Sequence, residues 1–113
     1  MDMRERVVDG VTVLDLSGKI ILGEGDVQIR ERIKELLADG QKRILLNLAE
    51  VSYMDSAGLG GLISSYATVK RESGQLKLVN LGHRVQDLLS ITKLITVFES
   101  YDDEKTALAS FKP

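Results

Sequence analysis

A short, nearly continuous apolar run, Ile44-Leu45-Leu46-Asn47-Leu48, constrains the fold of this chain more than any other segment. A strand with one face in water alternates apolar and polar residues, whereas this run is apolar at almost every position. It therefore predicts a central strand that is covered on both faces. A sheet built around such a strand needs helices to cover it, which indicates an α/β domain.

Several local patterns predict the remaining elements. An Asp9-Gly10 pair between two β-branched runs predicts a hairpin with strands near residues 4–8 and 11–16. From Asp26 the apolar residues recur with helical spacing, and Gly40 lies where that helix would end. The later segments are predicted as a helix that ends at Gly74, a strand at 76–79, a short helix around 85–89, a strand at 96–98 and a final helix from 102.

The order of these elements predicts the topology. Each strand–helix–strand segment is long enough for a right-handed crossover, so the later strands are expected to be parallel. The prediction is one small α/β domain over residues 1–113, with an N-terminal hairpin followed by alternating helices and strands. We expect a mixed sheet with helices packed mainly on one face.

The composition excludes several classes of function. The net charge is −2, from 15 basic and 17 acidic residues, and no clustered basic face indicates a nucleic-acid partner. The chain has no cysteine and a single histidine, His83, which argues against disulfides, thiolate chemistry and a histidine-based metal site. Residues 1–6 are charged and lead into no long apolar run, so we expect no signal peptide, no membrane partner and a cytoplasmic location.

The segment Met54-Asp55-Ser56-Ala57-Gly58-Leu59-Gly60-Gly61 places a hydroxyl among small residues at the expected start of a helix. Its glycines allow another backbone to approach closely. Two interpretations of Ser56 stay open: it caps the helix, or it is a docking site where a phosphate is added and removed. The segment is not a nucleotide-binding loop, because the GxxxxGK[ST] pattern is absent.

These residues resemble the signature of a known family. Asn47-Leu48 followed by residues 54–60 resembles that of the bacterial anti-sigma factor antagonists, which are STAS domains. The segments 16–20, 79–81, 85–89 and 91–94 are similar to further parts of the family pattern, so the resemblance covers nearly the whole chain. One departure is Ala57, which stands where many members carry Ser or Thr.

The resemblance implies a partner switch of the kind used in stress response and sporulation. The unphosphorylated antagonist binds an anti-sigma factor that is also a serine kinase, and this frees a sigma factor for transcription. The kinase then phosphorylates the motif serine, which is Ser56 here, and a serine phosphatase resets the switch. ATP is bound by the kinase, so no cofactor or metal is expected on this chain. The implied partner-binding residues are Ile20, Glu24, Asp55, Ser56, Ala57, Gly58, Leu59 and Gly60.

Other functions remain as alternatives. The same fold could serve as a STAS scaffold or regulatory subunit of a stress-signalling or transporter-associated complex, without phosphorylation of Ser56. An enzyme is not expected, because no carboxylate pair, nucleophile–base pair or metal-ligand spacing is present. The sequence leaves open whether the domain forms a weak homodimer.

Overall fold

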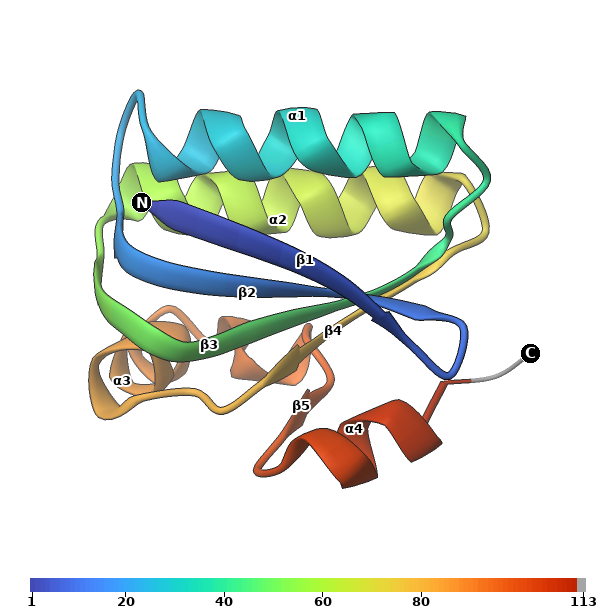
Figure 1. The fold of residues 1–113 in the computed structure, drawn as a ribbon. Helices are drawn as coiled ribbons and strands as arrows, with labels where there is room; N and C mark the ends of the chain where they lie inside the picture. The colour runs from blue at the N-terminus through green and yellow to red at the C-terminus, as the bar shows by residue number, and fades with distance from the viewer. Residues whose placement is uncertain (112–113) are drawn as a thin grey trace.

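Five strands form a single sheet whose spatial order, β1-β2-β3-β4-β5, is also their order in the sequence (Figure 1). The structure is a computed structural model, and it describes residues 1–111. The strands are β1 (Asp2–Val8), β2 (Val11–Ile20), β3 (Arg43–Met54), β4 (Gln75–Val79) and β5 (Ser100–Tyr101). The helices are α1 (Gly25–Ala38), α2 (Ser56–Arg71), α3 (His83–Ile91), the 3-10 helix η1 (Leu94–Thr96) and α4 (Glu104–Ala109).

The mixed sheet is confirmed. Strands β1 and β2 are antiparallel, and every later neighbouring pair is parallel. The predicted hairpin closes with two residues between Val8 and Val11, which are paired in the ladder. Its turn residues Asp9 and Gly10 have φ values of 52° and 77°. Two positive φ values are what a tight hairpin turn requires, and Asp-Gly is among the pairs that adopt them most readily.

The central strand is buried on both faces, as its apolar run predicts. Ile44 and Leu46 of β3 belong to the larger hydrophobic core, which also holds the buried faces of α1, α2 and α3. Leu45 points to the other face and packs in a smaller cluster with Ala107 of α4. Figure 1 shows α1 and α2 side by side on one side of the sheet and α4 on the other. Most of the helical cover therefore lies on one face.

The predicted last strand at 96–98 is wrong. Residues 94–96 form η1, and the strand is a two-residue segment at 100–101. Phe98 is apolar because it is a core residue in an irregular segment: it is 4% exposed, and its ring centroid lies 5.2 Å from that of Tyr66 in an edge-to-face contact. A short apolar run does not distinguish a strand from an irregular segment that anchors one side chain in the core.

Candidate functional site

The motif lies at the edge of the sheet where parallel strands β2 and β3 end together. Ile20, the last residue of β2, is the register partner of Met54, the last residue of β3. The chain turns from β2 into α1 and from β3 into α2 at the same edge (Figure 1). The loop after Ile20, predicted to join the motif in one surface, therefore lies beside the start of α2. We call this region the motif edge, meaning residues 20–25 together with residues 53–61.

Asp55 is the N-cap of α2 and connects the two parts of the motif edge. One of its carboxylate oxygens, Oδ1, accepts a hydrogen bond of 2.7 Å from the backbone N–H of Gly58. The other, Oδ2, accepts one of 3.2 Å from the backbone N–H of Leu22. The hydrogen bond from Gly58 lowers the pKa of Asp55, and that from Leu22 adds to the effect. Asp55 is therefore a carboxylate at neutral pH.

Ser56 is the first residue of α2 and is not its cap, so the capping interpretation of this serine is wrong. Asp55 supplies the capping oxygen instead. Ser56 is exposed, and within residues 1–111 its hydroxyl has no hydrogen-bond partner. The motif thus presents a hydroxyl that the fold itself does not use. Its role as phosphate acceptor stays a prediction.

Two of the motif glycines are required by close packing. A Cβ atom on Gly58 would lie 2.1 Å from the carbonyl oxygen of Ile20, and one on Gly61 would lie 2.9 Å from the Cβ of Asp26. These distances are shorter than any van der Waals contact allows, so the start of α2 can sit this close to β2 and α1 only with glycine. Gly60 differs, because a Cβ there would meet nothing within 4 Å.

Two apolar residues predicted to contact a partner, Ile20 and Leu59, are buried in the core, and so is the neighbouring Met54. Leu59 and Met54 are 5% and 6% exposed, and the side chain of Ile20 is completely buried. Each packs in the larger core beneath the motif. The carbonyl of Ile20 is used as well, because it accepts a hydrogen bond of 3.3 Å from the N–H of Asp55. These three side chains support the motif and do not present a surface to a partner.

Other apolar side chains, which were not predicted as partner-binding, are exposed on or beside the motif edge. Leu22 is 73% exposed in the loop after β2, and Tyr53 is 42% exposed at the end of β3. Ile91, at the end of α3, is 80% exposed. Tyr53 and Ile91 line a recess of about 250 Å³ together with Met54, Arg84, Asp87 and Leu88. Leu22 could have been noticed as an apolar residue just before the Gly23-Glu24-Gly25 loop.

The remaining residues predicted to bind a partner vary in exposure. Glu24 and Gly60 are exposed, and Ala57 is half-buried beside Ser56. Gly58 is buried against Ile20. The accessible part of the predicted surface is therefore Glu24, Asp55, Ser56, Ala57 and Gly60.

Asn47, the first residue of the family signature, has a structural role. Its side-chain amide donates a hydrogen bond of 2.8 Å to Asp15 on β2. Its side-chain oxygen accepts one of 3.1 Å from the amide of Asn80, which follows β4. Asp15 in turn pairs with Arg6 on β1 at 2.7 Å. Asn47 therefore links β3 to β2 and to the residue after β4, and Asp15 extends the network to β1.

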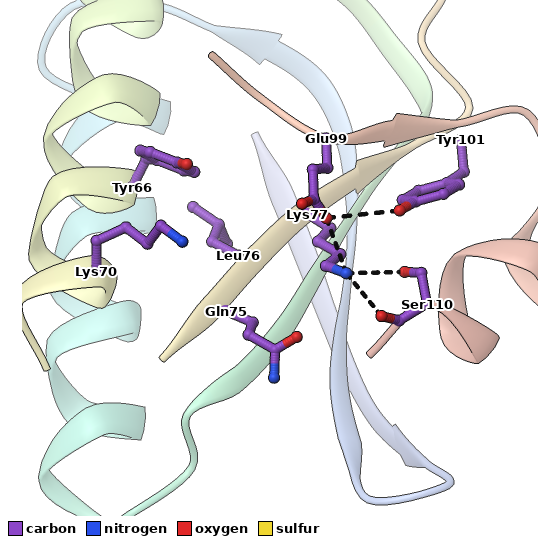
Figure 2. A pocket seen from close by; sticks show the side chains of 8 residues that line it. All are labelled: Tyr66, Lys70, Gln75, Leu76, Lys77, Glu99, Tyr101 and Ser110. Carbon is purple, nitrogen blue, oxygen red and sulfur yellow. Dashed lines mark hydrogen bonds and ion pairs between the residues drawn. The ribbon is translucent and has the colours of Figure 1, made fainter. Parts of the chain in front are cut away.

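A second recess, of about 280 Å³, lies beside β4 and surrounds Lys77 (Figure 2). The side chain of Lys77 is 9% exposed, and its ammonium group is 2.8 Å from the carboxylate of Glu99. The same group donates to the backbone oxygen of Ser110 at 2.9 Å and to its hydroxyl at 3.0 Å. The hydrogen bond from Lys77 lowers the pKa of Glu99. All three ammonium hydrogens have acceptors, so Lys77 stabilises the junction of β4, β5 and the residue after α4.

Among residues 1–111, no group of three or more His, Cys, Asp or Glu side chains is arranged to hold a metal ion. Over the same residues, none of the helices combines the length and the apolar composition that crossing a bilayer requires.

Comparison with known proteins gives a consistent result. A family model described as the STAS domain matches residues 2–107. The anti-sigma-B factor antagonist of Bacillus subtilis strain 168 is 39% identical over 83 residues, covering 70% of this chain and 75% of that protein.

Solved structures support the same family assignment. An anti-sigma factor antagonist from Mycobacterium paratuberculosis is 25% identical with a TM-score of 0.83, covering 96% of this chain and 92% of that one. The phosphorylated form of the Bacillus protein SpoIIAA shares the fold, with 20% identity, a TM-score of 0.72 and coverage of 94% and 96%. The chain therefore belongs to the STAS domain family and, within it, to the anti-sigma factor antagonists.

Proposed function

We propose that the unphosphorylated protein binds an anti-sigma factor that is also a serine kinase, and so releases a sigma factor. The kinase transfers a phosphate from its own ATP to Ser56, which ends binding, and a serine phosphatase removes the phosphate. The protein itself binds no cofactor and catalyses no reaction. The observation that carries this proposal is the exposed Ser56 hydroxyl, which has no partner within residues 1–111 because Asp55 caps the helix in its place.

The surroundings of Ser56 suit phosphoryl transfer. A kinase must bring the γ-phosphate into line with the acceptor oxygen, which requires space around it. Ser56 is in the first turn of α2, followed by Ala57, and the open position of Gly60 adds no side chain to that turn. Small neighbours therefore leave the hydroxyl accessible to the active site of a partner.

The fold is expected to tolerate the phosphate. Free backbone N–H groups and the positive end of the helix dipole favour an anion at a helix N-terminus. The carboxylate of Asp55 opposes it by like-charge repulsion, but both groups are in water-accessible positions. The main effect of phosphorylation is therefore expected on the partner complex.

The size of that effect is sufficient for a switch. A phosphate adds about −1.5 to −2 charges at neutral pH. Burying that charge without a partner against the kinase surface would cost roughly 3 kcal/mol, which corresponds to about 100-fold weaker binding. The complex would then dissociate at concentrations at which the unphosphorylated complex is stable.

Intact-mass measurement tests the proposal. The protein is incubated with ATP and its cognate anti-sigma factor kinase, and the mass of one added phosphate is expected. Ser56→Ala should remain unmodified, whereas Ser64→Ala, which removes another exposed serine of α2, should be phosphorylated like the wild type. Ser56→Glu should bind the kinase more weakly. Modification of Ser56→Ala, or unchanged affinity of Ser56→Glu, would contradict the assignment.

The alternative is a scaffold or regulatory subunit in a stress-signalling or transporter-associated complex. Such a protein would use the same surface without phosphorylation of Ser56. The neighbouring genes distinguish the two functions, because a small kinase and a sigma factor favour the switch, whereas a permease favours the transporter-associated complex.

A further inference from the structure

We propose that Asp55 is a positioning residue for partner recognition, which holds the loop after β2 so that Leu22 and Ser56 face the same partner. This inference rests on the proposed function and adds to it. It assigns to Asp55 a task beyond capping α2, and it assigns to Leu22 a contact with an apolar recess of the partner.

The two oxygens of Asp55 serve two different elements. Oδ1 accepts a hydrogen bond of 2.7 Å from the N–H of Gly58, within the first turn of α2. Oδ2 holds the N–H of Leu22, which is 33 positions earlier in the chain, at 3.2 Å. A single carboxylate therefore fixes the distance between the helix start that carries Ser56 and the loop that carries Leu22.

The cap of α4 shows that the second contact is not needed for capping. Asp103 is the N-cap of α4, and its Oδ1 accepts from the N–H of Thr106 at 2.8 Å. Its Oδ2 accepts from the hydroxyl of the same residue at 3.0 Å. Both oxygens of Asp103 thus stay within one helical turn. Asp55 has the same capping geometry but directs its second oxygen to another part of the chain.

Within the loop held by Asp55, the N–H of Glu24 donates a hydrogen bond of 3.2 Å to the carbonyl of Ile21, and the side chains add little restraint. The N-cap of α1, Glu24, makes no side-chain capping hydrogen bond, and Gly23 has a φ of 80°. The side chain of Leu22 is 73% exposed, so packing does not hold it in place. An exposed apolar side chain contributes to binding most when it is already fixed in its bound position, since binding then costs less conformational entropy. The hydrogen bond from the Leu22 N–H to Asp55 fixes the backbone at this position, which reduces the part of that cost that comes from ordering the loop.

Asp55→Asn separates the two contacts. Asparagine caps helices about as well as aspartate, because its oxygen can accept from the N–H of Gly58. Its other side-chain atom is an NH₂ group, a donor, which cannot accept the hydrogen bond from Leu22. Asp103→Asn is the matched control, since it makes the same chemical change at a cap with no contact to another element.

The experiment combines hydrogen exchange with kinase kinetics. In Asp55→Asn, the Leu22 amide is expected to exchange at least about 10-fold faster, and the KM for phosphorylation to rise about 5- to 10-fold with kcat nearly unchanged. Asp103→Asn should change neither quantity. Leu22→Ala should also raise KM, and adding Asp55→Asn to it should raise KM little further, because both changes remove the same contact.

Two results would overturn the inference. One is unchanged exchange of the Leu22 amide in Asp55→Asn, and the other is faster exchange with no change in KM. Failure of the proposed function gives a different result, because the wild-type protein would then not be phosphorylated at all. In that case the exchange of the Leu22 amide still tests whether Asp55 holds the loop.

Discussion

Ser56 lies beside the loop after β2 and Lys77 lines a recess beside β4, and these two polar residues have opposite surroundings in the fold. The ammonium group of Lys77 is mostly buried and has three acceptors, from Glu99 and Ser110. The hydroxyl of Ser56 is exposed and has none within the described part of the chain. A polar group whose hydrogen bonds are satisfied internally stabilises the fold, whereas an accessible group without partners is available to another molecule. The recess around Lys77 is therefore structural, and the motif edge is the candidate site.

The largest loss of stability is expected at the packed side of the motif. Gly58→Ala places a Cβ 2.1 Å from the carbonyl oxygen of Ile20, so backbone must move, and we expect a loss of about 3 kcal/mol or more. Gly60→Ala is the control and should be neutral or slightly stabilising, since a Cβ there has open space and alanine favours the helix. Denaturant unfolding measures both. If both variants lost the same stability, the close approach of α2 to β2 would not be the reason that position 58 requires glycine.

Lys77→Ala should cost less, about 2 kcal/mol, because it leaves Glu99 and the hydroxyl of Ser110 without their cation. The rate of Ser56 phosphorylation should stay unchanged, measured by intact mass over time. If Lys77→Ala lost phosphorylation but kept the stability of the wild type, Lys77 would act in function and the contrast with Ser56 would be wrong.

Acid should lower the free energy of unfolding through Asp55 and Glu99, by less than the substitutions at Gly58 and Lys77. Hydrogen bonds lower the pKa of Asp55 below its usual 3.8 and that of Glu99 below its usual 4.5. A lowered pKa in the folded state stabilises the protein above the unfolded-state pKa, and this contribution disappears as the pH falls through the folded-state pKa. Stability should therefore be nearly constant from about pH 7 to 5.5 and fall below about pH 4.5.

The ion pair between Lys77 and Glu99 allows the contribution of Glu99 to the acid effect to be measured separately. Glu99 is 60% exposed, so its share should be below about 1 kcal/mol. Lys77→Ala should lose that share and show a shallower decline in acid, measured by denaturant unfolding at several pH values. A decline as steep as in the wild type would mean that Lys77 does not lower the pKa of Glu99.

The smallest change in stability is expected for Ser56→Ala, within about 0.5 kcal/mol, because the hydroxyl has no internal partner in the described residues. The same variant should lose phosphorylation completely. Thermal unfolding checks the first expectation and intact mass the second. A large loss of stability would show that Ser56 belongs to the fold, as Lys77 does.

Local patterns were sufficient to predict most of the fold. The hairpin, the central strand and the helical stripes depend on neighbouring residues, and the sheet confirms them. The strand predicted at 96–98 is wrong, because the apolar character of Phe98 reflects a contact with Tyr66 more than 30 positions earlier. Such contacts leave no local periodicity.

The position of the motif at a helix start was predicted and is confirmed, but its detailed geometry was not predicted. The motif marks the helix start, but whether Asp55 or Ser56 caps it depends on backbone geometry at the end of β3. The need for glycine at 58 comes from the carbonyl of Ile20, in a strand far earlier in the sequence. The sequence alone also does not distinguish Leu22, which is exposed, from Leu59, which is buried.

The ion pair between the two ends of the chain has a consequence for the order of folding. Arg6 on β1 pairs with Glu104 at the start of α4, 98 positions later. Contacts this distant form late, because the entropy of closing so long a loop must be offset by structure already in place. The apolar cluster of Val11, Val13, Leu45 and Val79, which α4 covers with Ala107, therefore stays exposed during synthesis until α4 has left the ribosome. Until then this apolar face of the sheet is open to chaperones and to aggregation.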